Sequence, residues 1–211
     1  MVSKKLGMMF VLSSPSGVGK TTLTKMLEKS NSNYTISVSH TTRQPRQNEQ
    51  DGKDYYFVNN EKFEELIENG SFFEYAVIFG NYYGTLKKTV LHYQNIGKDV
   101  LFDIDWQGTQ QLKKKVDNSS LVTIFILPPN IETLKNRLVN RDQFGKQLAE
   151  ERMKKFREEV SHWSEYDYVV INNDLDECFN KLVTIIDCEK KGKKYQYSTK
   201  AIENLVKSLK E

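Results

Sequence analysis

Cysteine, histidine and proline are scarce in this 211-residue chain, which has two, three and four of them. Two cysteines without a C-x-x-C pair exclude a disulfide framework and a thiol-redox motif. The three histidines are scattered and show no metal-ligand spacing, so a histidine-based metal site is not expected. Cys178 falls at apolar helical spacing in the sequence, and we predict that it is buried in a helix.

Long apolar runs are also missing, so no membrane-spanning helix is predicted. The stretch Met8–Leu12 is too short for the apolar core of a secretory signal, and we expect a cytoplasmic protein. The formal net charge is only +3, whereas a domain that coats nucleic acid usually carries a stronger basic excess. We therefore expect small anionic molecules as partners, rather than nucleic acid or a membrane. The oligomeric state stays open.

Short apolar runs alternate with helical patterns along most of the chain. The run Met8–Ser13 precedes a helical pattern at Thr21–Lys29. Further apolar runs stand at Val100–Ile104, Leu121–Leu127 and Tyr168–Ile171. This alternation predicts an α/β protein with a parallel sheet flanked by helices.

One segment breaks this rhythm and predicts a small α+β insert. Phe72–Phe79 has strand character, and Gly80-Asn81 predicts a hairpin turn into a second strand, Tyr82–Thr85. A short helix at Glu61–Glu68 precedes the hairpin, with Asn60 as its expected N-cap.

A glycine-rich run joins the first predicted strand to the first predicted helix, which is the context that a phosphate-binding loop requires. Gly17 and Gly19 let backbone N–H groups turn towards a phosphate without steric clashes. Lys20 then reaches the β- and γ-phosphates, and the Thr21 hydroxyl binds Mg²⁺. The alternative is a chance glycine turn, and the first position departs from the usual glycine. The predicted ATP-binding residues of this run are Ser14, Pro15, Ser16, Gly17, Val18, Gly19, Lys20, Thr21 and Thr22.

Two aspartates close the predicted strand that begins at Val100. Asp103 and Asp105 share one face near its carboxyl end, where open α/β sheets bind ligands. A carboxylate there can hold Mg²⁺ or face a nucleotide, and we favour that role for Asp103. For Asp105, capping of the next helix is an equally open interpretation.

Glu74 is an acidic residue in an apolar setting. It shares one face of its predicted strand with Phe72, Ala76 and Ile78. An ionised carboxylate on such a face is costly unless it meets hydrogen-bond donors. A guanine base offers a two-donor edge, N1–H and N2–H₂, that a carboxylate accepts in parallel. The alternative is that this face is exposed to solvent.

Arg43 and Arg46 flank a proline, with hydroxyl residues before them and Tyr55 shortly after. Planar guanidinium groups beside hydroxyls suit a phosphate monoester. A stretch of this kind is otherwise an exposed loop.

Taken together, the motifs resemble the guanylate kinase family over essentially the whole chain. The matching blocks, in order, are Ser39–Arg46, Gly52–Tyr55, Gly80–Thr85, Asp103–Gly108 and Asn172–Leu175. The resemblance implies transfer of the γ-phosphate of Mg·ATP to GMP, and also to dGMP. It implies a P-loop core (residues 1–34, 87–136 and 158–211), a GMP-binding insert (35–86) and a helical lid (137–157).

The resemblance also implies a role for individual residues. The GMP phosphate would be held by Arg43, Arg46, Tyr55 and Tyr83, and the guanine by Ser39, Glu74, Thr85 and Asp105. Asp103 would act on the Mg²⁺ side and Asn172 would contact adenine. The residues implied in catalysis are Lys20, Arg46, Arg141 and Arg152.

Helix geometry adds a constraint on the lid. Arg141 and Arg152 are eleven residues apart, so in one straight helix they would lie about 16 Å apart. That is too far for both to reach one phosphoryl group, and we predict a turn at Asp142–Gln147. The alternative is that both are ordinary solvated helix residues, which is how we interpret Arg137 and Arg157.

Two other functions remain as alternatives. A guanylate-kinase-like binding module would bind phosphopeptides without catalysis, but such domains lack the intact phosphate loop that this chain has. A kinase for another nucleoside monophosphate is the third possibility. Glu74 argues against AMP, because adenine N1 is an acceptor and would face the carboxylate without a proton between them.

Overall fold

The structure is a computed structural model that describes residues 6–141 and 146–210, apart from the side chains of 118, 140, 141, 146–149 and 151. The chain forms two compact units. The first unit consists of residues 1–11 and 31–121, and the second consists of residues 12–30 and 122–211.

A five-stranded sheet has the strand order β2-β7-β1-β8-β9. The strands are β1 (Met9–Ser13), β2 (Tyr34–Ile36), β7 (Asp99–Asp103), β8 (Leu121–Leu127) and β9 (Tyr168–Ile171). The pairs β2/β7 and β8/β9 are parallel, and of the neighbouring pairs only β8 and β9 are consecutive strands along the chain. Every residue of β1 and β8 is buried, as expected for strands covered on both faces. The α/β fold class is confirmed, and the four strands predicted from apolar runs lie within one residue of their expected positions.

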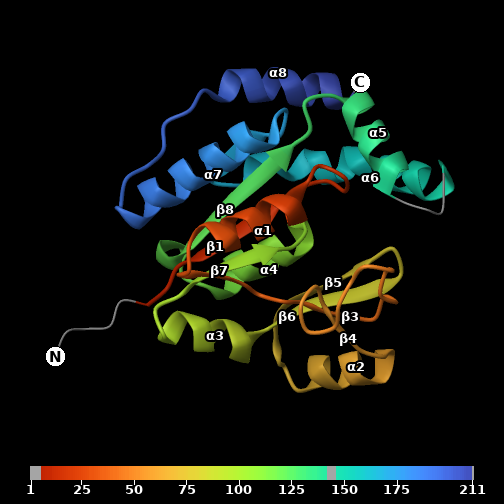
Figure 1. Cartoon of the computed structure of the whole chain (residues 1–211), viewed down its shortest axis with the longest axis vertical. Coiled ribbons are helices and arrows are strands. Elements are labelled where there is room, and N and C mark those ends of the chain that lie inside the picture. Colours follow the sequence, from red (N-terminus) through yellow and green to blue (C-terminus); the bar gives the residue numbers. More distant parts are fainter. Residues whose placement is uncertain (1–5, 142–145, 211) are drawn as a thin grey trace. The chain divides into compact units, whose positions relative to one another are not determined.

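The first unit carries a second sheet, of four strands in the order β4-β3-β6-β5 (Figure 1). The strands are β3 (His40–Thr41), β4 (Tyr56–Phe57), β5 (Phe72–Ile78) and β6 (Asn81–Leu86). All four lie inside the segment that we predicted as an α+β insert.

The β5–β6 hairpin turns one residue earlier than predicted. Ile78 pairs with Asn81, so the turn residues are Phe79 and Gly80 rather than Gly80 and Asn81. Both have positive φ, 49° and 75°, as a type I′ hairpin turn requires. The Asn81 side chain donates to the Phe79 carbonyl at 3.0 Å, which helps to hold an aromatic residue in this uncommon conformation.

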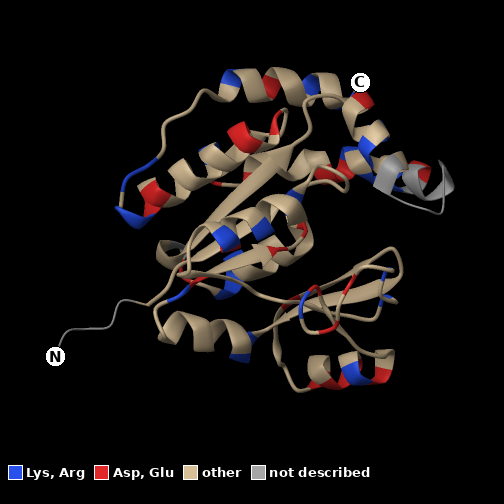
Figure 2. Ribbon diagram, viewed as in Figure 1, with Lys and Arg blue, Asp and Glu red and all other residues tan. Residues whose placement is uncertain are grey.

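Three α-helices complete the first unit: α2 (Asn60–Glu68), α3 (Lys87–Asn95) and α4 (Trp106–Lys115). The N-cap of α2 is Asn59, whose side chain accepts from the Lys62 N–H at 2.9 Å, so the prediction of Asn60 is wrong by one residue. Helix α2 is mostly acidic, and its one lysine, Lys62, pairs with Glu65 at 2.7 Å (Figure 2).

An apolar cluster joins β5, β7, α3 and α4 within the first unit. Its buried members are Met9, Val11, Phe73, Val90, Val100, Phe102, Ile104, Leu112 and Leu121. The side chain of Phe73 thus anchors the hairpin of the second sheet beside β7 and α4.

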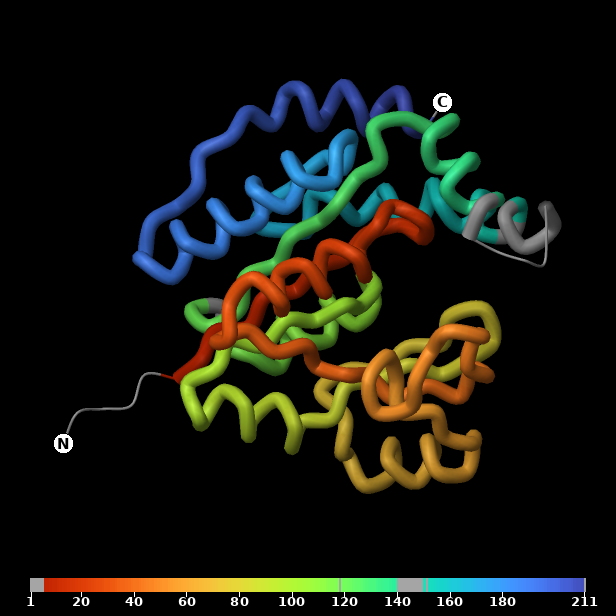
Figure 3. Tube along the Cα trace, viewed as in Figure 1, coloured from red at the N-terminus to blue at the C-terminus, as the bar shows by residue number. Residues whose placement is uncertain are grey.

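The second unit contributes five α-helices. In the described part of the chain, no helix has the length and apolar character that a membrane span requires. The five described helices are α1 (Lys20–Ser30), α5 (Ile131–Arg141), α6 (Lys146–Ser161), α7 (Leu175–Lys190) and α8 (Thr199–Lys210). Helix α1 contacts α7, and α6 contacts both α5 and α8. The linker after α7 leads the chain back into α8 (Figure 3). Most of the predicted lid turn, residues 142–145, lies outside the described residues.

Cys178 is buried in α7, as predicted. Burial raises the pKa of its thiol to about 11, because the charged thiolate would lose its hydration. The side chain therefore acts as a small apolar residue of the core.

The cap of α2 gives a direct test of the helix boundary. Asn59→Ala should lower the free energy of unfolding by about 1 kcal/mol, since the Lys62 N–H loses its acceptor. Asn60→Ala is the matched control and should cost only a few tenths of that amount, because alanine is a good helix former. Urea unfolding of the two variants measures both. A larger loss for Asn60→Ala would contradict the observed cap.

Candidate active site

The glycine-rich loop of the second unit needs its two glycines for both conformation and space. Gly17 has φ 85° and Gly19 has φ 104°, a region that other L-residues rarely adopt. A methyl group at Gly19 would lie 2.7 Å from Nδ2 of Asn172, and one at Gly17 would lie 2.7 Å from Cδ2 of Leu138. A side chain at either position would therefore force the loop away from its supports.

The Val18 carbonyl ties this loop to two other elements. It accepts from the Asn172 side-chain amide at 2.7 Å and from the Arg137 guanidinium at 3.3 Å. The same Arg137 nitrogen donates to the Asn172 carbonyl at 3.3 Å. Asn172 is 2% exposed and directly follows β9. Its amide thus holds the loop, and its predicted contact with adenine remains a prediction.

Arg137 was missed as a functional residue. The sequence predicts an ordinary solvated residue of its helix, but the Arg137 guanidinium forms a hydrogen bond with the loop at Val18. The available signal is its spacing from Arg141, because residues four apart lie on one helix face. Of the two predicted lid arginines, Arg152 is 7% exposed on α6. The side chain of Arg141, the last residue of α5, lies outside the description.

Helix α1 begins at Lys20, with Thr21 and Thr22 exposed in its first turn. The first N–H groups of a helix carry partial positive charge and favour an anion at this end. An acid lies close to the loop, since the Ser16 N–H donates to a Glu159 carboxylate oxygen at 3.3 Å. The loop therefore presents a hydroxyl, a lysine and backbone donors near one another.

Oxygen ligands for a hard divalent cation are available in both units. Thr21 offers an exposed hydroxyl in the second unit, and Asp103 offers a partly exposed carboxylate at the end of β7 in the first. The described residues contain no cluster of three His, Cys, Asp or Glu side chains that could form a metal cage. Oxygen atoms of either kind fit Mg²⁺, which usually keeps several waters and binds one or two protein oxygens together with substrate phosphates.

Two arginines, two tyrosines and one acid form a polar cluster in the first unit. Arg43 donates from Nε to the Tyr83 hydroxyl at 3.2 Å, and its guanidinium carbon lies 5.4 Å from the centre of the Tyr55 ring. The Tyr55 and Tyr83 rings meet edge to face at 5.9 Å. The sequence-predicted phosphate ligands Arg43, Tyr55 and Tyr83 thus lie in direct contact.

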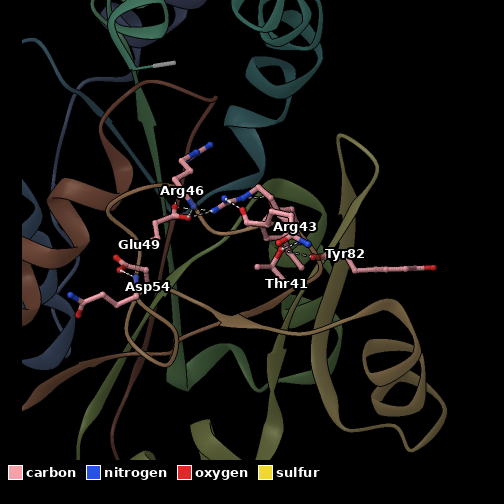
Figure 4. A network of polar contacts seen from close by, with 9 residues as sticks. Thr41, Arg43, Arg46, Glu49, Asp54 and Tyr82 are labelled. Carbon is pink, nitrogen blue, oxygen red and sulfur yellow. Dashed lines mark hydrogen bonds and ion pairs between the residues drawn. The ribbon is translucent and has the colours of Figure 1, made fainter. Parts of the chain in front are cut away.

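Glu49 joins the fourth predicted ligand, Arg46, to this cluster (Figure 4). Arg43 Nη2 donates to both Glu49 carboxylate oxygens at 2.9 Å, and the backbone N–H of Arg46 donates to one of these oxygens at 2.8 Å. The Arg46 guanidinium lies 3.6 Å from the same carboxylate and is more exposed than that of Arg43. Glu49 was not predicted, although its position three residues after Arg46 is a usable signal.

The Tyr55 hydroxyl stays protonated across the neutral range. Burial raises its pKa well above the ordinary tyrosine value, and the nearby charge of Asp103 raises it further. A protonated phenol donates a hydrogen bond, so Tyr55 is suited to an anionic ligand.

The predicted guanine-binding residues also gather in the first unit. Glu74 on β5 pairs across the ladder with Thr85 on β6, and the Thr85 hydroxyl lies 3.4 Å from that of Ser39. Glu74 is 3% exposed, so the alternative of a solvent-exposed face is wrong. A β-bulge between Phe72 and Glu74 breaks the strict alternation that the sequence suggested.

Asp105 is the N-cap of α4. One carboxylate oxygen accepts from the Gly108 N–H at 2.9 Å and the other from the Gln107 side chain at 3.1 Å. The capping interpretation is therefore confirmed, while its role towards guanine is a prediction.

Comparisons with known proteins agree on one family. The model of the guanylate kinase family matches residues 7–189. The chain is 48% identical to a guanylate kinase of Novosphingobium aromaticivorans over 87% of its own length and 83% of that protein. It is 47% identical to a guanylate kinase of Paramagnetospirillum magneticum, over 87% of this chain and 86% of the relative.

A solved structure is similar as well. The crystal structure of guanylate kinase from Anaplasma phagocytophilum superposes with a TM-score of 0.71 at 38% identity. The match covers 88% of this chain and 87% of that one. The similarity thus extends through both units and their sheets.

The Arg137 contact predicts a selective loss of nucleotide affinity. Arg137→Ala should weaken ATP binding roughly 10-fold, because the Val18 carbonyl loses a charged donor and the loop loosens. Calorimetric titration with ATP measures the change.

Lys135→Ala is the matched control, since Lys135 is exposed two residues earlier on the same helix. It removes the same charge without touching the loop. An equal loss of affinity in both variants would show that only net charge matters.

Proposed function

This chain belongs to the guanylate kinase family and is an ATP:GMP phosphotransferase, and we propose that it phosphorylates GMP and dGMP with the residues described above. One face of the β5–β6 hairpin carries this proposal. Tyr83 and Thr85 alternate on β6, so they share a face and lie about 6.6 Å apart along the strand. Thr85 lies with Glu74 and Ser39, whereas Tyr83 lies with Arg43. A buried acid at one end and a guanidinium at the other suit a guanine base joined to a phosphate.

Each end of this face would make a different kind of contact. Glu74 would accept both donors of the guanine edge, and Ser39 and Thr85 would add hydroxyl contacts. Arg43, Arg46, Tyr55 and Tyr83 would bind the phosphate monoester, with planar guanidinium groups that match its oxygens.

The phosphate loop would hold the second substrate. Lys20 and the loop N–H groups would orient the ATP phosphates, with the α1 N-terminus favouring their charge. Thr21 and Asp103 would hold Mg²⁺, which neutralises phosphate charge when it is bound. No covalent intermediate is needed, since positioning and charge stabilisation suffice for an in-line transfer.

The lid assignment belongs to the same proposal. Arg141 ends α5 and Arg152 lies within α6, so they stand on different helices. Their convergence on the transferring phosphoryl group would exclude water and protect ATP from hydrolysis. The boundaries 1–34, 87–136 and 158–211 for the core, 35–86 for the insert and 137–157 for the lid are part of this proposal. A cytoplasmic location belongs to it too, because both substrates are intracellular nucleotides.

The alternative functions make different demands on the same residues. A binding module for phosphopeptides would need the arginine cluster but has no use for the positive φ angles of Gly17 and Gly19. A kinase for AMP would place an acceptor, adenine N1, against the buried Glu74 carboxylate.

A substrate panel tests the function. ADP release should be rapid with GMP and dGMP and lower by about 10⁴-fold with AMP, because Glu74 would be left facing an acceptor. UMP and CMP should also be poor substrates. The measurement is a coupled assay at equal concentrations of each monophosphate. AMP turnover equal to that of GMP would contradict the role of Glu74.

Lys20 tests the phosphate loop. Lys20→Ala should lower kcat by at least about 10²-fold, because a preorganised charge at the transferring phosphate is lost. The melting temperature should stay at the wild-type value, since Lys20 is partly exposed. Lys25→Ala, an exposed lysine on the same helix, is the control and should retain turnover. Near wild-type turnover in Lys20→Ala would refute the loop assignment.

A further inference from the structure

Gly108 is the third residue of α4 and the only glycine inside a described α-helix. Its backbone has helical φ rather than positive φ, so alanine could adopt the same conformation. Conformational freedom therefore does not account for a glycine at this position. In a helix interior, glycine is less favourable than alanine.

Space accounts for it instead. A methyl group at Gly108 would lie 2.4 Å from Oε2 of Glu74 and 3.1 Å from its Cδ, and 3.3 Å from Cδ1 of Ile104. Contacts of 2.4 Å are far inside van der Waals distance. The carboxylate of Glu74 therefore packs directly against the α carbon of Gly108.

The strand cannot move aside to relieve such a clash, because side chains of α4 form hydrogen bonds with the backbone of β5. The Gln111 side chain accepts from the Tyr75 N–H at 3.2 Å and donates to the Tyr75 carbonyl at 2.6 Å. The Lys115 amine donates to the Phe73 carbonyl at 2.5 Å. These bonds flank Glu74 on both sides, and β6 pairs with β5 on its other edge.

We propose that Gly108 determines guanine specificity by leaving the space in which the Glu74 carboxylate is positioned. Gly108 is a positioning residue that touches no substrate and acts through Glu74. This inference rests on the proposed function, because it assumes that Glu74 accepts the guanine edge. A methyl group at 108 would push the flexible end of Glu74 away, while the backbone of α4 and β5 would stay in place.

The test compares GMP with IMP, which lacks the N2 amino group. The wild-type chain should prefer GMP about 10- to 100-fold, the worth of one hydrogen bond to a charged acceptor. In Gly108→Ala, kcat/KM for GMP should fall about 10²-fold, as a misplacement of about 1 Å can cause. The GMP preference over IMP should shrink towards equality, and the KM for ATP should not change. Lys114→Ala, an exposed residue of α4, is the control for changes in that helix.

A second variant distinguishes displacement of the Glu74 carboxylate from general damage to the fold. Glu74→Asp shortens the acid by one methylene, so in the Gly108→Ala background it removes the clash. The double variant should discriminate GMP from IMP no worse than Glu74→Asp alone. If Gly108→Ala lowers the melting temperature, Glu74→Asp should restore it. Multiplicative losses, or a melting temperature that is not restored, would overturn the proposal.

The two proposals fail in different ways. A wild-type chain that releases no ADP with GMP would refute the proposed function. The melting temperatures of the four variants would still report whether positions 108 and 74 compete for one space. A wild-type chain that is active on GMP, with an unchanged GMP-to-IMP ratio in Gly108→Ala, would refute the role of Gly108 alone.

Discussion

The carbonyl group of Val18 is the point on which the phosphate loop depends. A loop that turns its N–H groups towards a ligand must turn carbonyl groups towards the protein, where each needs a donor. Asn172 and Arg137 supply those donors, from the end of β9 and from α5. The Asn172 amide can approach only because Gly19 lacks a side chain. Gly19, Asn172 and Arg137 thus support the loop together, and a substitution at any one of them would alter the contacts of the loop.

In the first unit, helix α4 both covers part of the edge of β5 and positions Glu74. β5 is an edge strand, and exposed backbone groups on an edge invite pairing with other chains. The side chains of Gln111 and Lys115 satisfy part of this edge. The same bonds fix the distance between β5 and α4, and hence the place of the Glu74 carboxylate beside Gly108. Protection of the edge and geometry of the site therefore come from one set of contacts.

The sequence predicts most elements well where local patterns decide them. β8 and β9 are found at their predicted residues, because each is a bounded apolar run on a buried strand. Local patterns do not predict a helix boundary where two neighbouring residues are equally good caps. Asn59 and Asn60 can both cap a helix, and only the fold selects Asn59. The positive φ of Phe79 is also unpredictable, because aromatic residues rarely adopt it.

Long-range contacts account for the rest of what the sequence does not reveal. Arg137 looks like any charged residue on a helix until Val18 is brought beside it. Gly108 looks like a poor helix residue until the bulge in β5 turns Glu74 towards it. Motifs therefore predict which residues meet a substrate, whereas the residues that hold those motifs in place emerge only from the packed chain.

The carboxylate of Glu49 has a consequence for how an anion enters the arginine cluster. Arg43 and Arg46 already have a negative partner, so an incoming anion must exchange with it or share it. A monoanion such as chloride would replace one negative charge by another and gain little Coulomb energy, while losing its hydration. A phosphate monoester brings close to two charges near neutral pH and more acceptor oxygens, so it gains from the exchange. If the cluster binds GMP as proposed, Glu49 would favour a ligand with two negative charges over a monoanion, and it would leave the cluster less sensitive to common salts than two arginines without an acid.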